Sequence, residues 1–531
     1  MRKILLVFIV LNSQLFIFNC LSQPTIQWQK FYGGSAEEYG APIVQTTDGG
    51  YIVGGSALSH DGDVNGNHDN TNNYADYWLV KIDSAGTMQW SKCYGGSNDD
   101  VSGSTIQTSD GGYIMAGTTW SHDGNVSGNH NPNNSTSDAW VVKTDVFGNI
   151  LWKKCYGGSY NDGANKIIQT NDGGYIFAGY TYSNDGDVSG NHDTTHATND
   201  YWVVKIDSTG NIQWQKCYGG TLNDEAKTII QTADGGYAIT GNSCSNTGDV
   251  TGNHGGGTDA WLIKIDSAGT LLWSKCYGGT APYGDNSTTV IQTTDGGFII
   301  GGGTYSHDID CVGNHDTSGN YVDAWVIRTD GTGNEIWSKC YGGTSNDGIA
   351  CLIKSNDGGY VFAGNTSSND GDVNGNHGAH DYWIVKIDTS GTILWQQCYG
   401  GTQFDDAYSI IQTNDNGYAV VGASSSLGTH GAHDYWVIKL SQDNVGINEL
   451  QTSGEIKIYP NPSKGIFRIS TNSNQTLKDI IVYDVLGNII YQQLKEKETT
   501  VTIDLSAHAK GVYFVKVIED TRVSLSKVVL E

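Results

Sequence analysis

The sequence predicts an all-β fold, in which a seven-bladed β-propeller closed by its N-terminal strand precedes a small β-sandwich. A Trp-x-x-x-Tyr-Gly-Gly motif occurs seven times at intervals of 58 to 64 residues, and such a period indicates a repeat architecture. Every repeat contains four short apolar runs separated by turn signals, which is typical of antiparallel strands. The run at Ile26–Gly34 matches only the fourth strand of a repeat, and the seventh repeat ends after Asp434–Leu440 without its own fourth strand. The first strand therefore completes the last repeat and closes a ring.

Residues 1–22 have the features of a secretory signal peptide. Arg2 and Lys3 precede an apolar stretch, and Cys20-x-Ser22 supplies small residues before a cleavage point, so that Gln23 would begin the mature chain. A lipid anchor on Cys20 is the alternative interpretation. The sequence contains no later apolar run long enough to span a bilayer.

The repeats occupy residues 23–441, and their turns predict which loops share a face. In the third repeat an Asx-Gly turn joins the first two strands, and Asp207–Asn211 joins the last two. The long polar loop after the second strand and the crossover after the fourth must then emerge on the opposite side. Since loops carry function more often than strands do, we expect the ligand on this long-loop face.

The Trp and Cys residues follow the same period. Fourteen of the 15 Trp residues lie in the third and fourth strands, where blade-on-blade packing predicts that they are core residues. Six Cys residues share one fourth-strand position that Phe31 occupies in the first copy, which indicates apolar packing. Cys244 and Cys311 lie in equivalent loops of neighbouring repeats, where an export context permits a disulfide, and the pairing of Cys351 stays open.

Residues 442–453 are predicted to form a polar linker, and residues 454–531 a separate small β domain. Within it, the segments IYPNPSKGIFRI at 458–469, VYDVLGNII at 482–490, KGVYFVKV at 510–517 and the terminal KVVLE resemble the type A C-terminal sorting domain of the bacterial type IX secretion system. The resemblance implies a translocon and a sorting peptidase as partners. It also implies a final location outside the cell or on the outer cell surface, either released or attached.

The repeat pattern carries a second resemblance. The motif YGG-S/T-x-x-D, followed by DGGY-x-x-x-G, is similar to the repeats of secreted bacterial seven-bladed propellers. That resemblance implies the fold and no single activity.

The charge of the chain excludes some partners. The net charge is −27, and the excess of acidic residues lies in the repeat region, since the last 83 residues are neutral. Such a field repels nucleic acids and anionic membranes and favours cations.

The long loops contain candidate calcium ligands. In repeats one, three and six, side-chain oxygens occur at every second residue beside a glycine that permits a sharp turn, and calcium prefers six to eight such oxygen ligands. The alternative is a set of Asx turns that satisfy their own backbone. Calcium is the one cofactor that this pattern suggests, and its candidate ligands are Asp61, Asp63, Asn65, Asn67, Asp69, Asp185, Asp187, Ser189, Asn191, Asp193, Asp370, Asp372, Asn374 and Asn376.

Two other polar sets repeat with the blades. The His residues of the Gly-Asn-His motifs are expected to brace their loops, because equivalent positions on different blades lie too far apart to share a metal. Acidic residues that follow Tyr-Gly-Gly, such as Asp100 and Asp162, are expected to bind backbone amides of the crossovers. A ring of acids that binds a cation at the channel mouth is the alternative.

The sequence favours a binding or structural module over an enzyme. It contains no GxSxG, HExxH or P-loop motif, and its acidic residues repeat almost identically, whereas an active site requires one asymmetric set. We therefore predict no catalytic residues and expect a glycan or a protein as the ligand. A secreted polysaccharide-acting enzyme of the endoglucanase or lyase type is the alternative.

Overall fold

The computed structural model describes residues 23–131, 135–316, 318–426, 431–443, 456–471, 477–484, 489–519 and 523–531. The described residues form two compact units, one comprising Gln23–Asp443 and the other the C-terminal strands. The predicted signal peptide at 1–22 and most of the predicted linker at 442–453 lie outside the described residues.

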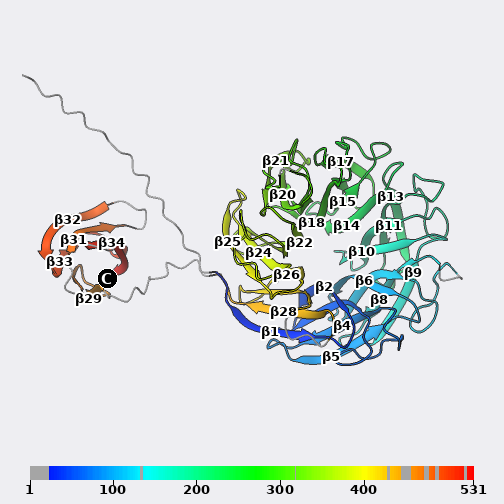
Figure 1. Cartoon of the computed structure of the whole chain (residues 1–531), viewed down its shortest axis with the longest axis horizontal. Coiled ribbons are helices and arrows are strands. Elements are labelled where there is room, and N and C mark those ends of the chain that lie inside the picture. The colour runs from blue at the N-terminus through cyan, green and yellow to red at the C-terminus, as the bar shows by residue number, and fades with distance from the viewer. Residues whose placement is uncertain are drawn as a thin grey trace, which may run out of the picture. The chain divides into compact units, whose positions relative to one another are not determined.

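The first unit is a ring of seven four-stranded antiparallel sheets within the described residues, as predicted (Figure 1). The first strand of each blade faces the centre of the ring and the fourth lies at the rim. The innermost strands are β2 (Glu38–Gln45), β6 (Asp100–Gln107), β10 (Asp162–Gln169), β14 (Asp224–Gln231), β18 (Asp285–Gln292), β22 (Asp347–Lys354) and β26 (Asp405–Gln412). The second strands are β3 (Tyr51–Ala57), β7 (Tyr113–Thr119), β11 (Tyr175–Thr181), β15 (Tyr237–Ser243), β19 (Phe298–Thr304), β23 (Tyr360–Thr366) and β27 (Tyr418–Ser424).

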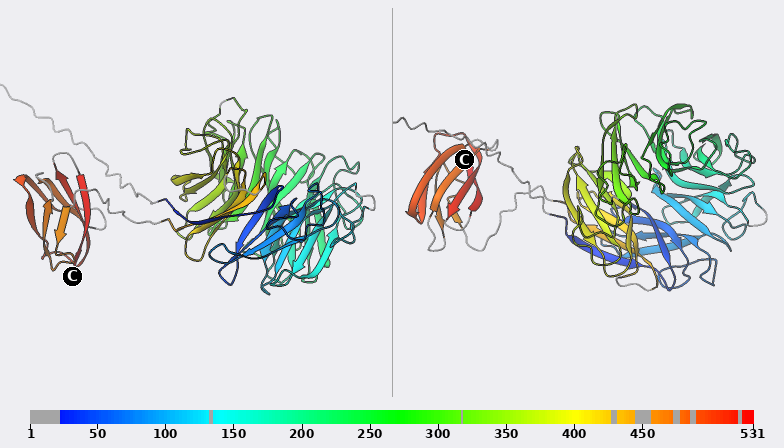
Figure 2. Two further views of the ribbon diagram at one scale, coloured as in Figure 1. Left: turned by 60° about the horizontal axis from the view of Figure 1, so that its bottom comes forward. Right: turned by 45° about the horizontal axis from the view of Figure 1, so that its top comes forward.

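The third and fourth strands complete each blade and are visible obliquely in Figure 2. The third strands are β4 (Asp76–Ile82), β8 (Asp138–Thr144), β12 (Asp200–Ile206), β16 (Asp259–Ile265), β20 (Asp323–Thr329), β24 (Asp381–Ile387) and β28 (Asp434–Leu440). The rim strands are β5 (Met88–Tyr94), β9 (Ile150–Tyr156), β13 (Ile212–Tyr218), β17 (Leu271–Tyr277), β21 (Glu335–Tyr341), β25 (Ile393–Tyr399) and β1 (Ile26–Tyr32).

The N-terminal strand closes the ring. Strand β1 pairs antiparallel with β28, with Phe31 opposite Trp436, so that residues at the two ends of the propeller share one blade. This arrangement confirms the prediction drawn from the incomplete repeats at both ends. No sheet edge is left open between the first and last blades.

The apolar core lies between neighbouring blades. All seven third-strand Trp residues are fully buried, as predicted. Six rim-strand Trp residues are only half-buried, each beside the hairpin turn of the next blade, whereas Trp395 is buried. A Cβ atom on Gly86 would lie 2.9 Å from the Trp28 ring, and the Trp28 indole donates a hydrogen bond to the carbonyl of Ser84 (3.1 Å).

A buried cation stabilises the turn between the first two strands of each blade. In blade three, Lys205 lies on β12 with its side chain almost wholly buried, and its Nζ atom is 2.9 Å from a carboxylate oxygen of Asp172 in the Asp-Gly-Gly turn. Equivalent pairs occur in the other blades, with Arg328 and Asp295 in blade five. This pair was not predicted from the sequence, although a Lys near the end of an apolar third strand is its signal.

The cysteines of the described residues are all free. The disulfide permitted between Cys244 and Cys311 does not form. Cys311 is fully buried in a core cluster with Tyr277 of the fourth blade and Phe298 of the fifth, whereas Cys244 follows strand β15 of the fourth blade. Cys311 therefore acts as a small apolar core residue.

The second unit is a small all-β domain of two layers within the residues described. One sheet has the strand order β29-β30-β33 and the other β32-β31-β34-β35. Their apolar faces share one core, to which Phe467, Ile480 and Val515 belong. The strands are β29 (Ile456–Tyr459), β30 (Ile466–Thr471), β31 (Leu477–Tyr483), β32 (Ile489–Glu498), β33 (Thr500–Asp504), β34 (Gly511–Glu519) and β35 (Val523–Leu530). The described part of the chain contains no helix long and apolar enough to cross a membrane.

Candidate functional site

Each long loop packs against the crossover that enters its own blade. In blade three the amide of Asp187 donates a hydrogen bond to the carbonyl of Gly157 (2.8 Å). The carboxylate of Asp185 accepts hydrogen bonds from the amide and the hydroxyl of Ser159, both 2.8 Å long. Long loops and crossovers therefore form one continuous face, as the strand order predicts.

The candidate calcium ligands of blade three are engaged in separate hydrogen bonds. The Asn191 side chain donates to the carbonyl of Thr181 (2.9 Å) and accepts from the amide of Asp193 (2.9 Å). The carboxylate of Asp193 accepts from three backbone amides of its own loop, at Thr195, Ala197 and Thr198. The hydroxyl of Ser189 accepts a hydrogen bond from Gln215 on the rim strand (2.7 Å).

Blades one and six repeat these contacts. Asp61 and Asp370 accept crossover amides, Asp63 and Asp372 accept the amide of the first glycine of the Tyr-Gly-Gly motif, and Asp69 accepts three amides of its own loop. Asn67 and Asn376 donate to strand-end carbonyls, and the backbone carbonyls of Asn65 and Asn374 accept hydrogen bonds from the rim strand. Among the described residues, no group of three or more His, Cys, Asp or Glu side chains could hold a metal ion. Calcium binding by these loops stays a prediction.

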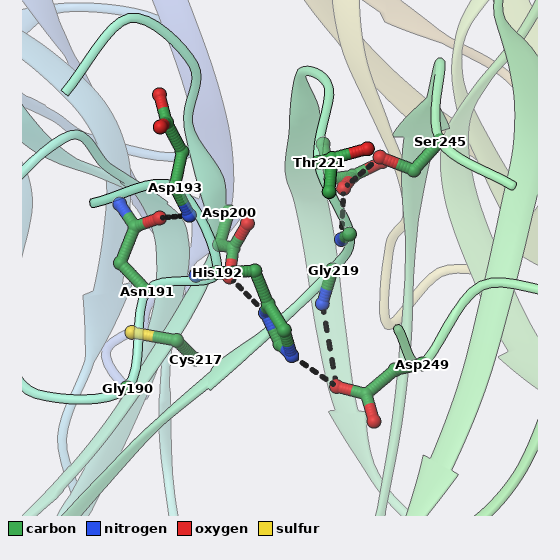
Figure 3. A network of polar contacts seen from close by, with 12 residues as sticks. Gly190, Asn191, His192, Asp193, Asp200, Cys217, Gly219, Thr221, Ser245 and Asp249 are labelled. Atoms are coloured by element: carbon green, nitrogen blue, oxygen red, sulfur yellow. Dashed lines mark hydrogen bonds and ion pairs between the residues drawn. The ribbon is translucent and has the colours of Figure 1, made fainter. Parts of the chain in front are cut away.

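A network of His and Asp side chains connects neighbouring blades (Figure 3). In blade three, Nδ1 of His192 lies 2.5 Å from Oδ2 of Asp200, which begins strand β12. Its Nε2 atom faces Oδ2 of Asp249 in the long loop of blade four at 3.8 Å. Asp249 also accepts the amide of Gly219 (3.4 Å). The predicted bracing role of these His residues is confirmed, and it extends across the blade junction.

The carboxyl groups at each junction are fully buried in pairs. A Cβ atom built on Gly219 would lie 2.6 Å from Oδ1 of Asp200 and 2.7 Å from Oδ2 of Asp224, so the two carboxyls flank the glycine. Oδ2 of Asp224 accepts the amide of Gly220 (2.8 Å) and the hydroxyl of Ser245 (2.8 Å). This contact confirms that the acids after Tyr-Gly-Gly brace the crossovers. Oδ1 of Asp200 is buried without a hydrogen-bond partner.

Burial changes the protonation of these junctions. Removal from water disfavours the charged form, and it raises the pKa of several of the crossover and third-strand acids. The pKa reaches about 7 for Glu38, Asp100 and Asp162, and about 6 for Asp224, Asp259 and Asp323. The hydrogen bond that His192 makes to Asp200 raises the pKa of His192 above its ordinary value. Several junctions therefore contain an acid whose pKa lies close to neutral pH.

Exposed aromatic side chains occur on the long-loop face at only some of the blades. The crossover position of Tyr160 is occupied by Ala36, Asn98 and Leu222 in other blades. Tyr160 stacks on His196 of the long loop with ring centroids 4.0 Å apart. The exposed fractions of the set lie between 40% and 65%, and its members are Tyr39, Tyr74, Tyr160, Tyr283, Tyr321 and Phe404. Sequence analysis missed this set because the residues lie outside the repeated motifs.

Comparison with known families identifies the C-terminal unit. Residues 457–531 match the secretion system C-terminal sorting domain, which confirms the type IX resemblance. The chain therefore carries a C-terminal sorting signal for export to the cell surface or the extracellular space.

The propeller has more distant relatives. The chain is 24% identical over 379 residues to the regulatory protein FlaEY of Caulobacter vibrioides, a match that covers 65% of this chain and 39% of the relative. Among solved structures, a fungal alcohol oxidase in complex with copper has 11% identity and a TM-score of 0.43, covering 96% of this chain and all of that one. A puromycin hydrolase has 11% identity and a TM-score of 0.42, covering 82% of this chain and 58% of that one. At these TM-scores the structural likenesses carry no argument about activity.

Proposed function

We propose that the propeller is a binding module that recognises a glycan outside the cell through its long-loop face. The observation that carries this proposal is the set of exposed aromatic side chains on that face. The repeated aromatic residues pack between blades or against the turns of neighbouring blades, so their regular spacing builds the scaffold. The six exposed ones are placed at positions where the scaffold does not require an aromatic ring.

The chemistry of the face favours a sugar. A Tyr side chain offers an apolar ring for stacking and a hydroxyl for hydrogen bonding, and both complement the alternating C–H and O–H surfaces of a sugar ring. The loops around these rings are rich in Asn, Ser and Thr. The acidic field of the chain disfavours anionic ligands, so a neutral glycan fits best.

The C-terminal sorting domain also supports this proposal. Export by the type IX route would bring the propeller to the outside of the cell, where polysaccharides are abundant. The module would then hold a polysaccharide at the surface or carry the released protein to it.

A binding experiment with matched variants tests the proposal. The full chain is applied to an array of neutral glycans and compared with a Tyr74→Ala, Tyr160→Ala, Tyr321→Ala triple variant. The control is Phe147→Ala, since Phe147 is 67% exposed in a tight turn on the opposite face. We expect the triple variant to lose binding and the control to keep it. Absence of binding by the unaltered chain, or equal loss in both variants, would contradict the proposal.

A further inference from the structure

The junction between blades four and five departs from the repeat in two coupled ways. In blade three, His192 and its partner Asp200 are eight residues apart, whereas His254 and Asp259 in blade four are separated by five. The following crossover is longer. Gly279 donates to a carboxyl six residues ahead, at Asp285, whereas the equivalent spacing in blade three is four.

The longer crossover fills the space left by the shorter loop. A Cβ atom on Gly256 would lie 2.6 Å from the carbonyl oxygen of Thr280, and one on Gly257 would lie 2.6 Å from the amide nitrogen of Gly284. The glycines of the short loop are therefore needed for this contact. The insertion is held in place, and it projects Pro282 and Tyr283 from the face.

A pocket of about 320 Å³ lies beside this insertion. Its walls are the crossover at 280–283, the start of the long loop of blade five at 306–308, and the end of that loop at 318–320. The exposed fraction of Tyr283 is 65%, and its ring lies 5.5 Å from that of Tyr305, at 51°. The volume is at the lower end of the roughly 300–1,000 Å³ that small-molecule sites occupy.

The far wall of the pocket is fixed by one acid. The carboxylate of Asp316 accepts the amides of Ser318, Asn320 and Tyr321 at 2.8–2.9 Å. These three hydrogen bonds hold residues 318–321 in one conformation, and the side chain of Asn320 stays exposed. A ligand would thus meet a preformed wall that loses little entropy on binding.

The charges around the pocket limit the class of ligand. The lining residues include no Lys or Arg, so an anionic ligand would have no fixed positive partner in an acidic protein. The lining carboxylate, Asp308, already accepts the amide and hydroxyl of Thr280 at 2.9 and 2.5 Å. The Ser318 hydroxyl already donates to the Asp316 carboxylate and accepts the Asn320 side-chain amide (2.8 Å). Asn320 and His307 therefore supply the further hydrogen-bonding groups of the pocket.

We infer that this pocket binds one or two rings of a neutral saccharide, stacked on Tyr283 and hydrogen-bonded to the Ser318–Asn320 wall. The inference rests on the proposed glycan-binding function and assigns it a specific subsite. The ring of Tyr283 supplies the apolar platform, and the polar wall selects for hydroxyl groups.

The test uses four neutral disaccharides and one anionic control. Cellobiose, maltose, mannobiose and N,N′-diacetylchitobiose are titrated into the full chain by calorimetry and saturation-transfer NMR, with digalacturonic acid as the anionic probe. We expect at least one neutral disaccharide to bind and digalacturonic acid not to bind. Tyr283→Ala should weaken binding about tenfold through loss of the stacking surface, and Asn320→Ala should weaken it as well.

The matched control separates this subsite from the face as a whole. Leu222→Ala removes an exposed apolar side chain (49% exposed) at the equivalent crossover position of blade four and should leave disaccharide affinity unchanged. If Leu222→Ala and Tyr283→Ala weaken binding equally, or if Tyr283→Ala has no effect while the triple variant loses glycan binding, the pocket assignment is wrong and the proposed function stands. If no neutral disaccharide binds, or digalacturonic acid binds as well as they do, the inference fails. Circular dichroism spectra that match the unaltered chain show that the variants are folded.

Discussion

The buried carboxyl of Asp162 should make the propeller less stable as the pH rises through neutrality, and Asp162→Asn should remove that dependence. Oδ2 of Asp162 accepts the amide of Gly158 (2.7 Å) and the hydroxyl of Ser183 (2.8 Å), and Oδ1 accepts the hydroxyl of Thr181. The side chain is fully buried. An Asn amide can keep the oxygen at the Oδ2 position and donate to Thr181, whose hydroxyl can rotate to accept. The substitution therefore imitates the protonated acid.

The direction and size of this change in stability follow from the pKa shift of Asp162. Burial raises the pKa of Asp162 from 3.8 to about 7, so the folded state holds a proton that the unfolded state releases. The stabilisation is complete below the unfolded pKa and is lost as the pH rises through the folded pKa. Between pH 5 and pH 7 the loss is about 1.4 kcal/mol per pH unit, or roughly 3 kcal/mol for this one group.

Urea unfolding at pH 5 and pH 8, followed by Trp fluorescence, measures the effect. All 15 Trp residues precede residue 444, so the signal reports on the propeller alone. The loss of unfolding free energy between the two pH values should be smaller by roughly 3 kcal/mol in Asp162→Asn than in the unaltered chain. The control is Asp207→Asn, because turn hydrogen bonds lower the pKa of the exposed Asp207 and this group stays ionised in both states across the interval.

Two outcomes would refute the reasoning. Parallel pH profiles for Asp162→Asn and the unaltered chain would show that the buried acid does not take up a proton on folding. A flattened profile in the Asp207→Asn control would show that the pH dependence comes from general surface charge.

Three further predictions concern the junction, the loops and the sorting domain. Gly219→Ala should lower the unfolding free energy by roughly 1–3 kcal/mol more than Gly331→Ala, because a Cβ on Gly219 meets two buried carboxyls while one on Gly331 meets no atom nearer than 3.3 Å; equal losses in urea unfolding would contradict this. Calcium at 1 mM should stabilise the propeller by about 1.4 kcal/mol for each long-loop site with a Kd near 10⁻⁴ M. The thermal midpoint followed by Trp fluorescence should therefore be higher with calcium than with chelator, and an unchanged midpoint would remove the calcium prediction. A chain without residues 457–531 should stay in the periplasm of a type IX-competent host, and its appearance outside the cell in fractionation blots would show that another signal directs export.

The architecture could be predicted because the repeats at the two ends of the array are incomplete and complement each other. The blade that stops at Leu440 lacks its fourth strand, and few arrangements other than pairing with the strand at Ile26–Tyr32 leave it no open edge. The exposure of the rim Trp residues could not be predicted in the same way. Both Trp positions carry the same spacing and the same residue type, and only the turn of the next blade decides that Trp28 is half-covered while Trp436 is fully enclosed.

The candidate calcium site was harder to predict because two different loop structures share the same spacing of oxygen-bearing residues. Oxygens at every second residue suit a calcium loop, and they equally suit a loop whose side chains bind amides two residues ahead, as Asp193 does with Thr195. The His192–Asp200 contact lies within one repeat and its spacing recurs in the sequence. The approach to Asp249 belongs to the next blade, so it depends on how the blades pack and no local motif encodes it.

The departures from the repeat indicate where a ligand can bind, because the polar side chains at repeated positions already form the hydrogen bonds of the blade junctions. Blades four and six both have shortened long loops, in which the His and its Asp partner are five and four positions apart. In blade six the crossover keeps its usual length, and His380 packs against Phe404 with centroids 4.9 Å apart, so aromatic contact fills the space. After blade four the crossover is extended, and Tyr283 stays 65% exposed although its ring lies 5.5 Å from that of Tyr305. One deletion therefore yields a closed contact and the other an open pocket, and the length of the crossover is the difference between them.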